Sequence, residues 1–227
     1  MPRPLRLAVL FAFTLAVAGC GLFDDAVSSA ERARLIDDMA SQLERGNSVS
    51  YVAYYQLAGG VRATVAHHAE PSRTVMTFPG GLILQDATGQ TQCETTLHPV
   101  KCQVRTLTPA AAGLADSYAE ATKRGLIAGP VVRDLLRLAW EQPSAVLEPL
   151  DATIVGHPAS CLKVSGLTGA PASSFTACVT SDGVLASFTG DLNGLLVDQA
   201  LVRVGGKPPD ETFALPEGAK IQDLRQS

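Results

Sequence analysis

The chain has 227 residues, of which 46% are hydrophobic and 18% are charged, and its formal net charge is −4 at pH 7. This length fits one domain, or at most two small ones. The acidic balance and the absence of any Lys/Arg cluster argue against nucleic-acid binding, which needs a concentrated basic face.

The N-terminal segment has the pattern of an export signal. Arg3 and Arg6 provide a positive start, and residues 7–18 form an apolar run that is too short to span a bilayer permanently. The segment ends in Val-Ala-Gly-Cys at 17–20, which has the form of a lipobox, where the cysteine thiol takes a diacylglyceryl group. We therefore expect cleavage before Cys20 and lipidation of its thiol. The alternative is an ordinary secretory signal that contains a cysteine.

This interpretation divides the chain into three parts. Residues 1–19 are the lipoprotein signal peptide, residues 20–29 a lipidated tether, and residues 30–227 a single domain. Removal of the signal takes away Arg3 and Arg6 and no acidic residue, so the net charge falls from −4 to −6.

An amphipathic helix is expected after the tether. Ile36, Met39, Ala40 and Leu43 recur at helical spacing, and Gly46-Asn47 ends the pattern. From Val49 onward, β-branched, aromatic and Thr-rich runs alternate with turn residues, which is typical of strands. The predicted strands are 49–58, 61–68, 73–78, 81–86, 90–95 and 100–105.

The middle of the chain is richer in Ala and Leu and predicts helices at 109–124 and 130–142. Pro109 and Pro130 stand at their starts, where proline is well tolerated. Leu135, Leu138 and Ala139 mark an apolar stripe on the second helix, and Trp140 is expected to be buried. A second β block is predicted at 151–156, 160–166, 173–180, 183–189 and 195–204, followed by a last extended segment at 212–221.

Four cysteines remain beside Cys20, and an even number outside the cytoplasm favours disulfides. Three pairings are possible; the local ones, Cys93 with Cys102 and Cys161 with Cys178, fit hairpins best. Zinc ligation is the alternative, but the spacings are not those of paired zinc knuckles.

Strand phase agrees with the second of these pairs. If Cys161 faces Cys178, then Leu162 faces Ala177 and Val164 faces Phe175 on one apolar face.

A large sheet interrupted by helices curls around them rather than staying flat. The enclosed side then forms a hydrophobic cavity that suits acyl chains. The alternative is that the helical stripe closes a solid core.

The order of elements resembles the LolA-type lipoprotein carriers and the LppX/LprG lipid-binding lipoproteins. The stretches that carry the resemblance are the opening helix, Ser-Tyr-Val-Ala-Tyr-Tyr-Gln at 50–56, the strand-turn series through 79–86, and the closing Phe-Ala-Leu-Pro-Glu-Gly-Ala at 213–219. The resemblance implies an α+β fold: a curved antiparallel, unclosed β-barrel with an N-terminal helix and a central helical lid over a hydrophobic interior. A chain tethered at Cys20 would hold or present a lipid rather than shuttle it.

No catalytic or metal-binding pattern stands out. His67 and His68 are adjacent on a predicted strand and point to opposite faces, so they do not chelate one ion together. Ser160 and Lys163 have the spacing of a serine-lysine pair, but they too fall on opposite faces of a strand, whereas that chemistry uses a helical turn. Phosphate-loop, dinucleotide and nucleophile-elbow patterns are absent from the sequence. We expect no enzyme activity, no cofactor and no metal.

The sequence therefore predicts a membrane-anchored extracytoplasmic lipoprotein that binds a lipid or other hydrophobic ligand. Its expected place is the outer face of the cytoplasmic membrane of a bacterium, and abundant Ala, Gly, Pro and Arg suggest an actinobacterium. The alternative is a non-catalytic interaction or sensor module that contacts another envelope protein. The candidate cavity residues are Tyr55, Val65, Met76, Leu84, Leu135, Leu138, Phe175 and Phe188.

Overall fold

The computed structural model describes residues 20–107 and 116–225. Its helices are α1 (Cys20–Arg45), α2 (Ala119–Lys123) and α3 (Gly129–Trp140), with short 3-10 helices between elements. The strands are β1 (Tyr51–Leu57), β2 (Arg62–His68), β3 (Arg73–Phe78), β4 (Gly81–Asp86), β5 (Gly89–Glu94), β6 (Lys101–Arg105), β7 (Val146–Ile154), β8 (His157–Ser165), β9 (Ser174–Thr180), β10 (Leu185–Leu192), β11 (Leu195–Gly205) and β12 (Lys220–Asp223).

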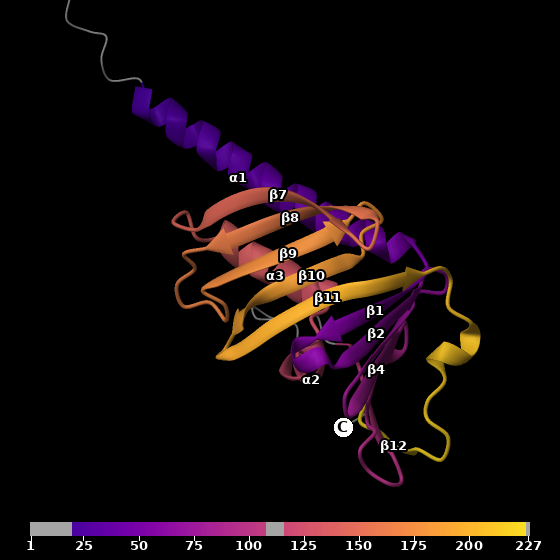
Figure 1. Ribbon diagram of the computed structural model, residues 1–227. Coiled ribbons are helices and arrows are strands. Elements are labelled where there is room, and N and C mark those ends of the chain that lie inside the picture. The colour runs from indigo at the N-terminus through magenta and orange to yellow at the C-terminus, as the bar shows by residue number, and fades with distance from the viewer. Residues whose placement is uncertain (1–19, 108–115, 226–227) are drawn as a thin grey trace, which may run out of the picture.

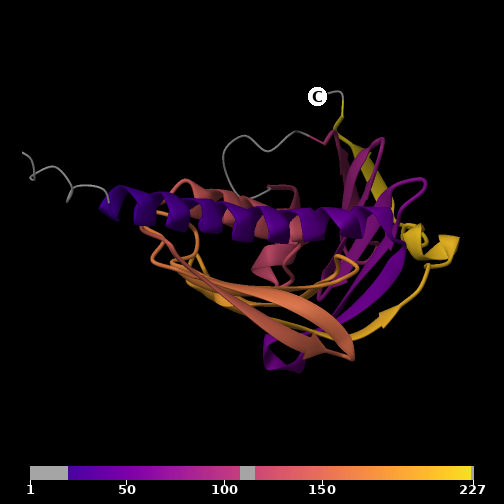
Figure 2. The ribbon, with the colours of Figure 1, turned by 90° about the horizontal axis from the view of Figure 1, so that it is seen from above.

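All these strands form one sheet, in the order β12-β6-β5-β4-β3-β2-β1-β11-β10-β9-β8-β7. Neighbours are antiparallel except β12 and β6, which are parallel. Because the edge strands β12 and β7 do not pair with each other, the sheet stays open; it curves around α1 and α3, which lie on its concave side (Figures 1 and 2). The expected curved, unclosed, mostly antiparallel sheet with an N-terminal helix is confirmed.

The strand predictions hold best in the first β block, where alternation and turn residues define the ends. Strands β1 to β6 lie within two residues of their expected bounds. In contrast, β7 begins at Val146, ahead of the expected 151, and contains Pro149. Because β7 is an edge strand, one of its sides makes no hydrogen bonds to a neighbouring strand, and a proline is tolerated there. The expected extended segment at 212–221 was wrong in part, because a 3-10 helix occupies Asp210–Phe213 and only β12 is extended.

The segment that was expected to be a tether is helical. Residues 20–29 belong to the helix, which Figure 1 shows projecting beyond the sheet. The signal peptide at 1–19 and most of the lipobox lie outside the described residues. No described helix is long and apolar enough to cross a membrane.

Arg32 joins α1 to the end of α3. Its guanidinium donates hydrogen bonds to the carbonyl oxygens of Ala139 (3.2 Å), Gln142 (2.9 Å) and Ala145. These carbonyls lie at and just after the C-terminus of α3, where a positive charge complements the helix dipole. The contact fixes the direction of α3 under the sheet.

The main core lies between α1, α3 and the concave face of the sheet. Phe175 and Phe188 stack there with ring centroids 5.7 Å apart. The buried face of α3 consists of Val131, Val132, Leu135, Leu136 and Ala139. Trp140 is 54% exposed, so the expectation that it is buried was wrong; α3 ends there, and its last residue points away from the core face.

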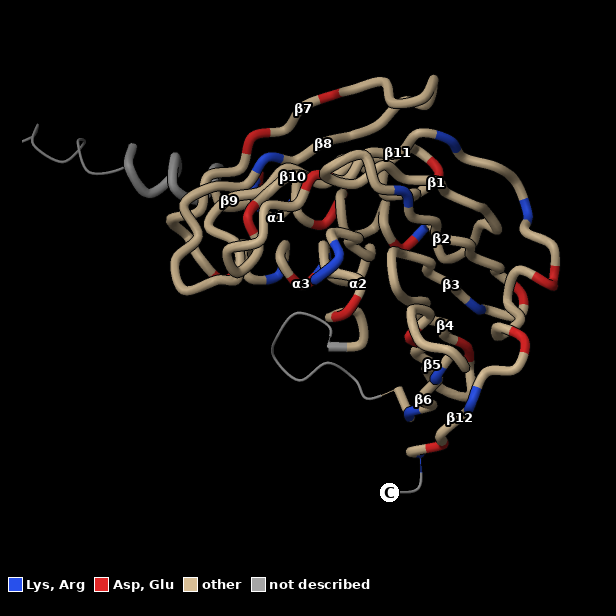
Figure 3. The backbone as a smooth tube through the Cα atoms, turned by 60° about the horizontal axis from the view of Figure 1, so that its bottom comes forward, with Lys and Arg blue, Asp and Glu red and all other residues tan. Residues whose placement is uncertain are grey.

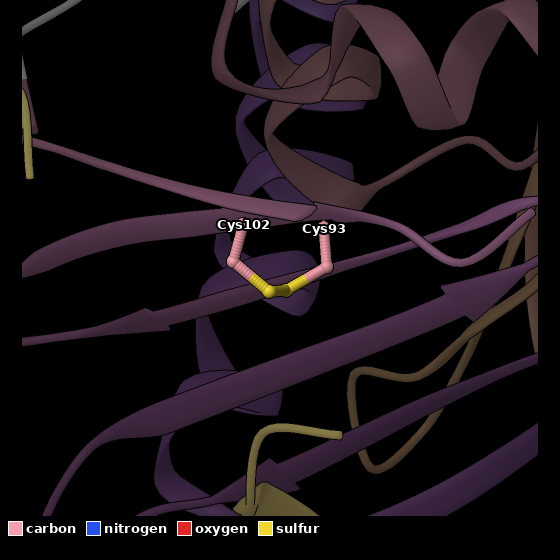
Figure 4. The surroundings of a disulfide bond; sticks show 2 residues. All are labelled: Cys93 and Cys102. Atoms are coloured by element: carbon pink, nitrogen blue, oxygen red, sulfur yellow. A yellow bond between two sulfur atoms is a disulfide. The ribbon is translucent and has the colours of Figure 1, made fainter. Parts of the chain in front are cut away.

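A smaller cluster covers the convex side of the first β block. Cys93 and Cys102 face each other across β5 and β6 and form a disulfide (Figure 4). The disulfide packs with Leu82 and Phe213. The second disulfide, Cys161–Cys178, also has the expected register. Both local pairings are confirmed, and they indicate an oxidising, extracytoplasmic location.

The register of the second pair is also confirmed beyond the cysteines. Leu162 faces Ala177 and Val164 faces Phe175, and all four side chains are buried in the main core.

Candidate ligand groove

The register of the first β block places polar side chains in one row across the concave face. The residues that face each other from strand to strand are Tyr51, His67, Thr74, Gln85, Gln90 and Arg105, in the order β1 to β6. The next row inward is Ala53, Val65, Met76, Ile83, Gln92 and Gln103, which is apolar over β1 to β4 and carries amides on β5 and β6. We call the row from Tyr51 to Arg105 the polar row.

Two connected hollows lie over these rows. The outer one, the groove, has a volume of about 660 Å³ and runs between the polar row, Tyr118 and the start of α3. The inner pocket has a volume of about 90 Å³ and reaches toward β1 and β10. Both are lined by Asn47, His67, Thr74, Tyr118, Pro130 and Arg133. The shared lining makes the groove the open side of the inner pocket.

The deep end of the inner pocket is apolar. Tyr55, Val65 and Met76 line it together with Leu43 and Ile127. The Tyr55 hydroxyl donates a hydrogen bond of 2.8 Å to the carbonyl oxygen of Leu185, and burial raises the pKa of Tyr55 well above its usual value. That phenol is neutral and already bonded, so its ring offers the pocket an apolar surface.

His67 stands in the polar row with both ring nitrogens engaged. Nε2 lies 3.0 Å from the carbonyl oxygen of Asn47, so it must donate, and Nδ1 then accepts from the Thr74 hydroxyl at 2.8 Å. Burial lowers the pKa of His67, which keeps the ring neutral at pH 7. His67 therefore orders the pocket wall rather than offering a charge or a base.

Tyr118 and Gln85 form the opposite wall of the groove. The Tyr118 hydroxyl donates to Gln85 Oε1 at 2.6 Å. The other half of that amide, Nε2, is buried and has no hydrogen-bond partner among the described residues. A buried donor without a partner has a free-energy cost that a ligand acceptor would remove.

The N-terminal part of α3 provides positive charge to the site. Arg133 lines both hollows, and its side chain is 35% exposed, with an ion pair of 3.2 Å to Glu44 on α1. Gly129 and Pro130, at the N-terminus of the helix, also line the inner pocket, and Ala128 before them offers no capping side chain. The positive end of the helix dipole therefore faces this side of the pocket.

The expected cavity residues divide into three groups. Tyr55, Val65 and Met76 line the inner pocket as expected. Leu135, Phe175 and Phe188 are buried in the main core and line neither hollow, because α3 fills the space that they would have shared with a ligand.

Two of the expected cavity residues were placed wrongly. Leu84 packs on the convex side with the smaller cluster, since it faces Val75 and alternates with Ile83 and Gln85. Leu138 is half-buried and lies outside the buried face of α3, which turns Leu135 and Leu136 inward instead.

Sequence reasoning missed Arg133, Tyr118 and the glutamines of the polar row. The amides at Gln85 and Gln90 follow the strand alternation and could have been found from the expected hairpin registers. Arg133 could not, because its proximity to β2 and β3 depends on how α3 enters the half-barrel.

No other chemical centre appears in the described residues. They hold no group of three or more His, Cys, Asp or Glu residues that could bind a metal ion. The positions of Lys, Arg, Asp and Glu are spread along strands, helices and loops (Figure 3).

The comparisons with known proteins concern the fold alone. No family model and no curated protein matches the sequence. An uncharacterised conserved protein from Thermus thermophilus superposes with a TM-score of 0.52 at 10% identity, covering 82% of this chain and 98% of that one. A DUF1329 family protein from Desulfovibrio piger aligns over 80% of this chain and 96% of its own length at 10% identity, with a TM-score of 0.33 that is too low to indicate a shared fold. The chain thus shares an open, curved-sheet fold with a protein of unassigned activity.

Proposed function

We propose that this chain is an extracytoplasmic lipoprotein, anchored through Cys20, that binds a lipid or other hydrophobic ligand in the groove and takes part in no catalysis. The observation that carries this proposal is an inner pocket, apolar at its deep end, that shares lining residues with a larger groove on the concave side of the sheet. Apolar walls with a few placed polar groups are typical of sites for such ligands.

The volumes favour one position for the proposed ligand. An enclosed pocket of about 90 Å³ is smaller than the engineered cavity of about 150 Å³ that admits benzene. A whole alkyl chain does not fit there while α3 is in place. The ligand therefore lies along the groove with one apolar end in the inner pocket, and deeper insertion requires α3 to move outward.

The second candidate function is an interaction or sensor module, and the filled core favours it. Leu135 and Leu136 are fully buried beneath the sheet, so most of the expected hollow is solid protein. Leu196 and Val202, on the exposed face of β11, are the apolar groups that such a module would offer to an envelope protein. Ligand binding that depends on the inner pocket separates the two functions.

Replacing Cys20 by alanine tests the anchor. The variant should accumulate as unprocessed precursor and incorporate no labelled fatty acid, because the thiol that forms the thioether is gone. Metabolic labelling followed by gel electrophoresis measures both effects, with Ser29→Ala as a matched control in the same helix. Undiminished labelling of the Cys20→Ala chain would disprove the anchor.

Replacing Val65 by phenylalanine tests the pocket. The larger side chain occupies the inner pocket, so affinity for dodecanol, an uncharged twelve-carbon alcohol, should fall about tenfold or more. Isothermal titration below the micellar concentration measures it. Val202→Phe, which adds the same bulk on an exposed position of β11, should bind as the wild type does. Equal affinity in the wild type and Val65→Phe would contradict the proposed site.

A further inference from the structure

Three groups around the two hollows offer unsaturated hydrogen-bond donors or positive charge. Gln85 Nε2 is buried without a partner. Among the described residues, Arg133 forms an ion pair with the exposed carboxylate of Glu44. The start of α3, with Gly129, is uncapped by any side chain and adds positive potential.

Several acceptors at the site are already engaged. Gln85 Oε1 accepts from Tyr118 and His67 Nδ1 accepts from Thr74. Asp86 lines the far end of the groove, but its carboxylate accepts from the backbone and hydroxyl of Thr88. Arg73 also lines the groove; it is paired with Asp210, and its Nε is a buried donor that has no partner among the described residues. A ligand therefore meets spare donors and one partly free positive charge.

We propose that the groove selects amphiphiles with an anionic headgroup, a carboxylate or a phosphate, held by Arg133 and Gln85 at the mouth of the inner pocket while the alkyl chain contacts Val65 and Met76. This inference rests on the proposed function and names its ligand class. The headgroup supplies acceptors to both donors, and its charge is favoured by the end of α3. Glu44 competes with the ligand for Arg133.

The headgroup is tested by titrating the whole mature protein with four probes of known structure: dodecanoate, dodecyl phosphate, dodecanol and inorganic phosphate. Either anionic amphiphile should bind at least about tenfold more tightly than dodecanol, because charge-assisted bonds replace neutral ones. The tighter of the two identifies the headgroup. Inorganic phosphate binding as tightly as dodecyl phosphate would overturn the amphiphile and leave a site for free anions.

The failure of this inference differs from failure of the proposed function. Equal affinity for dodecanol and both anionic amphiphiles overturns the headgroup selection and leaves a hydrophobic site in place. Binding of no twelve-carbon probe overturns both.

Variants assign the selection to Arg133. Arg133→Gln should remove the preference for anionic over neutral probes, so that the anionic amphiphiles bind no more tightly than dodecanol to this variant. Arg137→Gln is the matched control, one turn further along α3 and paired with Glu141 away from the groove. Loss of preference in both variants would overturn the role of Arg133.

The partner of Arg133 provides a test with the opposite sign. Glu44→Gln should raise affinity for the anionic probes about twofold to fivefold, because it frees the guanidinium from an exposed ion pair. If the ion pair had only a structural role, Glu44→Gln would weaken binding of the anionic probes just as Arg133→Gln does. That result would overturn the proposal.

Discussion

Replacing Gly183 by alanine is expected to lower the free energy of unfolding by about 3–4 kcal/mol and the melting temperature by about 10 °C. The turn between β9 and β10 holds this glycine at φ +85°, a conformation that costs an L-residue energy. An added Cβ would lie 2.2 Å from the backbone nitrogen of Gly46 and 2.5 Å from the carbonyl oxygen of Gln42. Both are rigid backbone atoms, so α1 itself would have to move.

Gly194 provides the matched control for this substitution. It has φ +83° in the turn between β10 and β11, and an added Cβ there meets nothing within 4 Å. Gly194→Ala should therefore show only the conformational cost, about 1–2 kcal/mol. Chemical denaturation of both variants measures the difference, and equal losses would show that the close approach of α1 has no energetic weight.

This contact also matters for the groove. Gly46 and Gly183 both line the inner pocket, together with Leu43 near the end of α1 and Asn47 just after it. A helix displaced at this point changes the shape of the pocket wall. Gly183→Ala protein that remains folded should consequently bind dodecanol more weakly than Gly194→Ala protein does.

Replacing Gln199 by leucine is expected to cost about 2–4 kcal/mol of stability. The Gln199 side chain is fully buried on β11, where its Oε1 accepts from the backbone N–H of Ile127 at 2.6 Å and its Nε2 donates to the carbonyl oxygen of Ile127 at 3.3 Å. Gln199 thereby gives hydrogen-bond partners to the backbone N–H and carbonyl groups of Ile127, just before the start of α3. Leucine would leave both buried backbone groups without a partner.

Gln56→Leu is the control for this second prediction, because Gln56 is exposed on β1 and no core contact depends on its amide. Guanidinium denaturation should place the midpoint of Gln199→Leu well below those of the wild type and Gln56→Leu. A midpoint that matches the control would mean that water replaces the lost bonds and that Gln199 does not hold α3 in place.

The sequence predicted most of what depends on local pattern. Alternation and turn residues located β1 to β6 and the two hairpin disulfides, because strand register follows directly from side-chain phase. Residues 108–115, part of the first expected central helix, lie outside the described residues.

What the sequence did not predict depends on packing between distant segments. Helical periodicity marked Leu135 and Leu138 together, yet only the contact of α3 with the sheet decides that Leu136 is buried and Leu138 is not. Gln199 reads as a polar residue of an exposed strand until the chain before α3 is placed against it. Arg133 becomes part of a site for the same reason.

The described structure thus divides the concave side into two regions. Under β7 to β11 it is a solid core closed by α3, and over β1 to β4 it is a groove with an apolar end and a polar row.

Native mass spectrometry of the lipidated protein, extracted from its own membrane in mild detergent, tests the central claim most directly. The wild type should carry a non-covalent adduct in the mass range of one amphiphile, and Val65→Phe prepared in parallel should carry little or none. A wild-type spectrum with only the mass of the acylated chain, or an adduct equally abundant in Val65→Phe, would contradict a ligand in the groove.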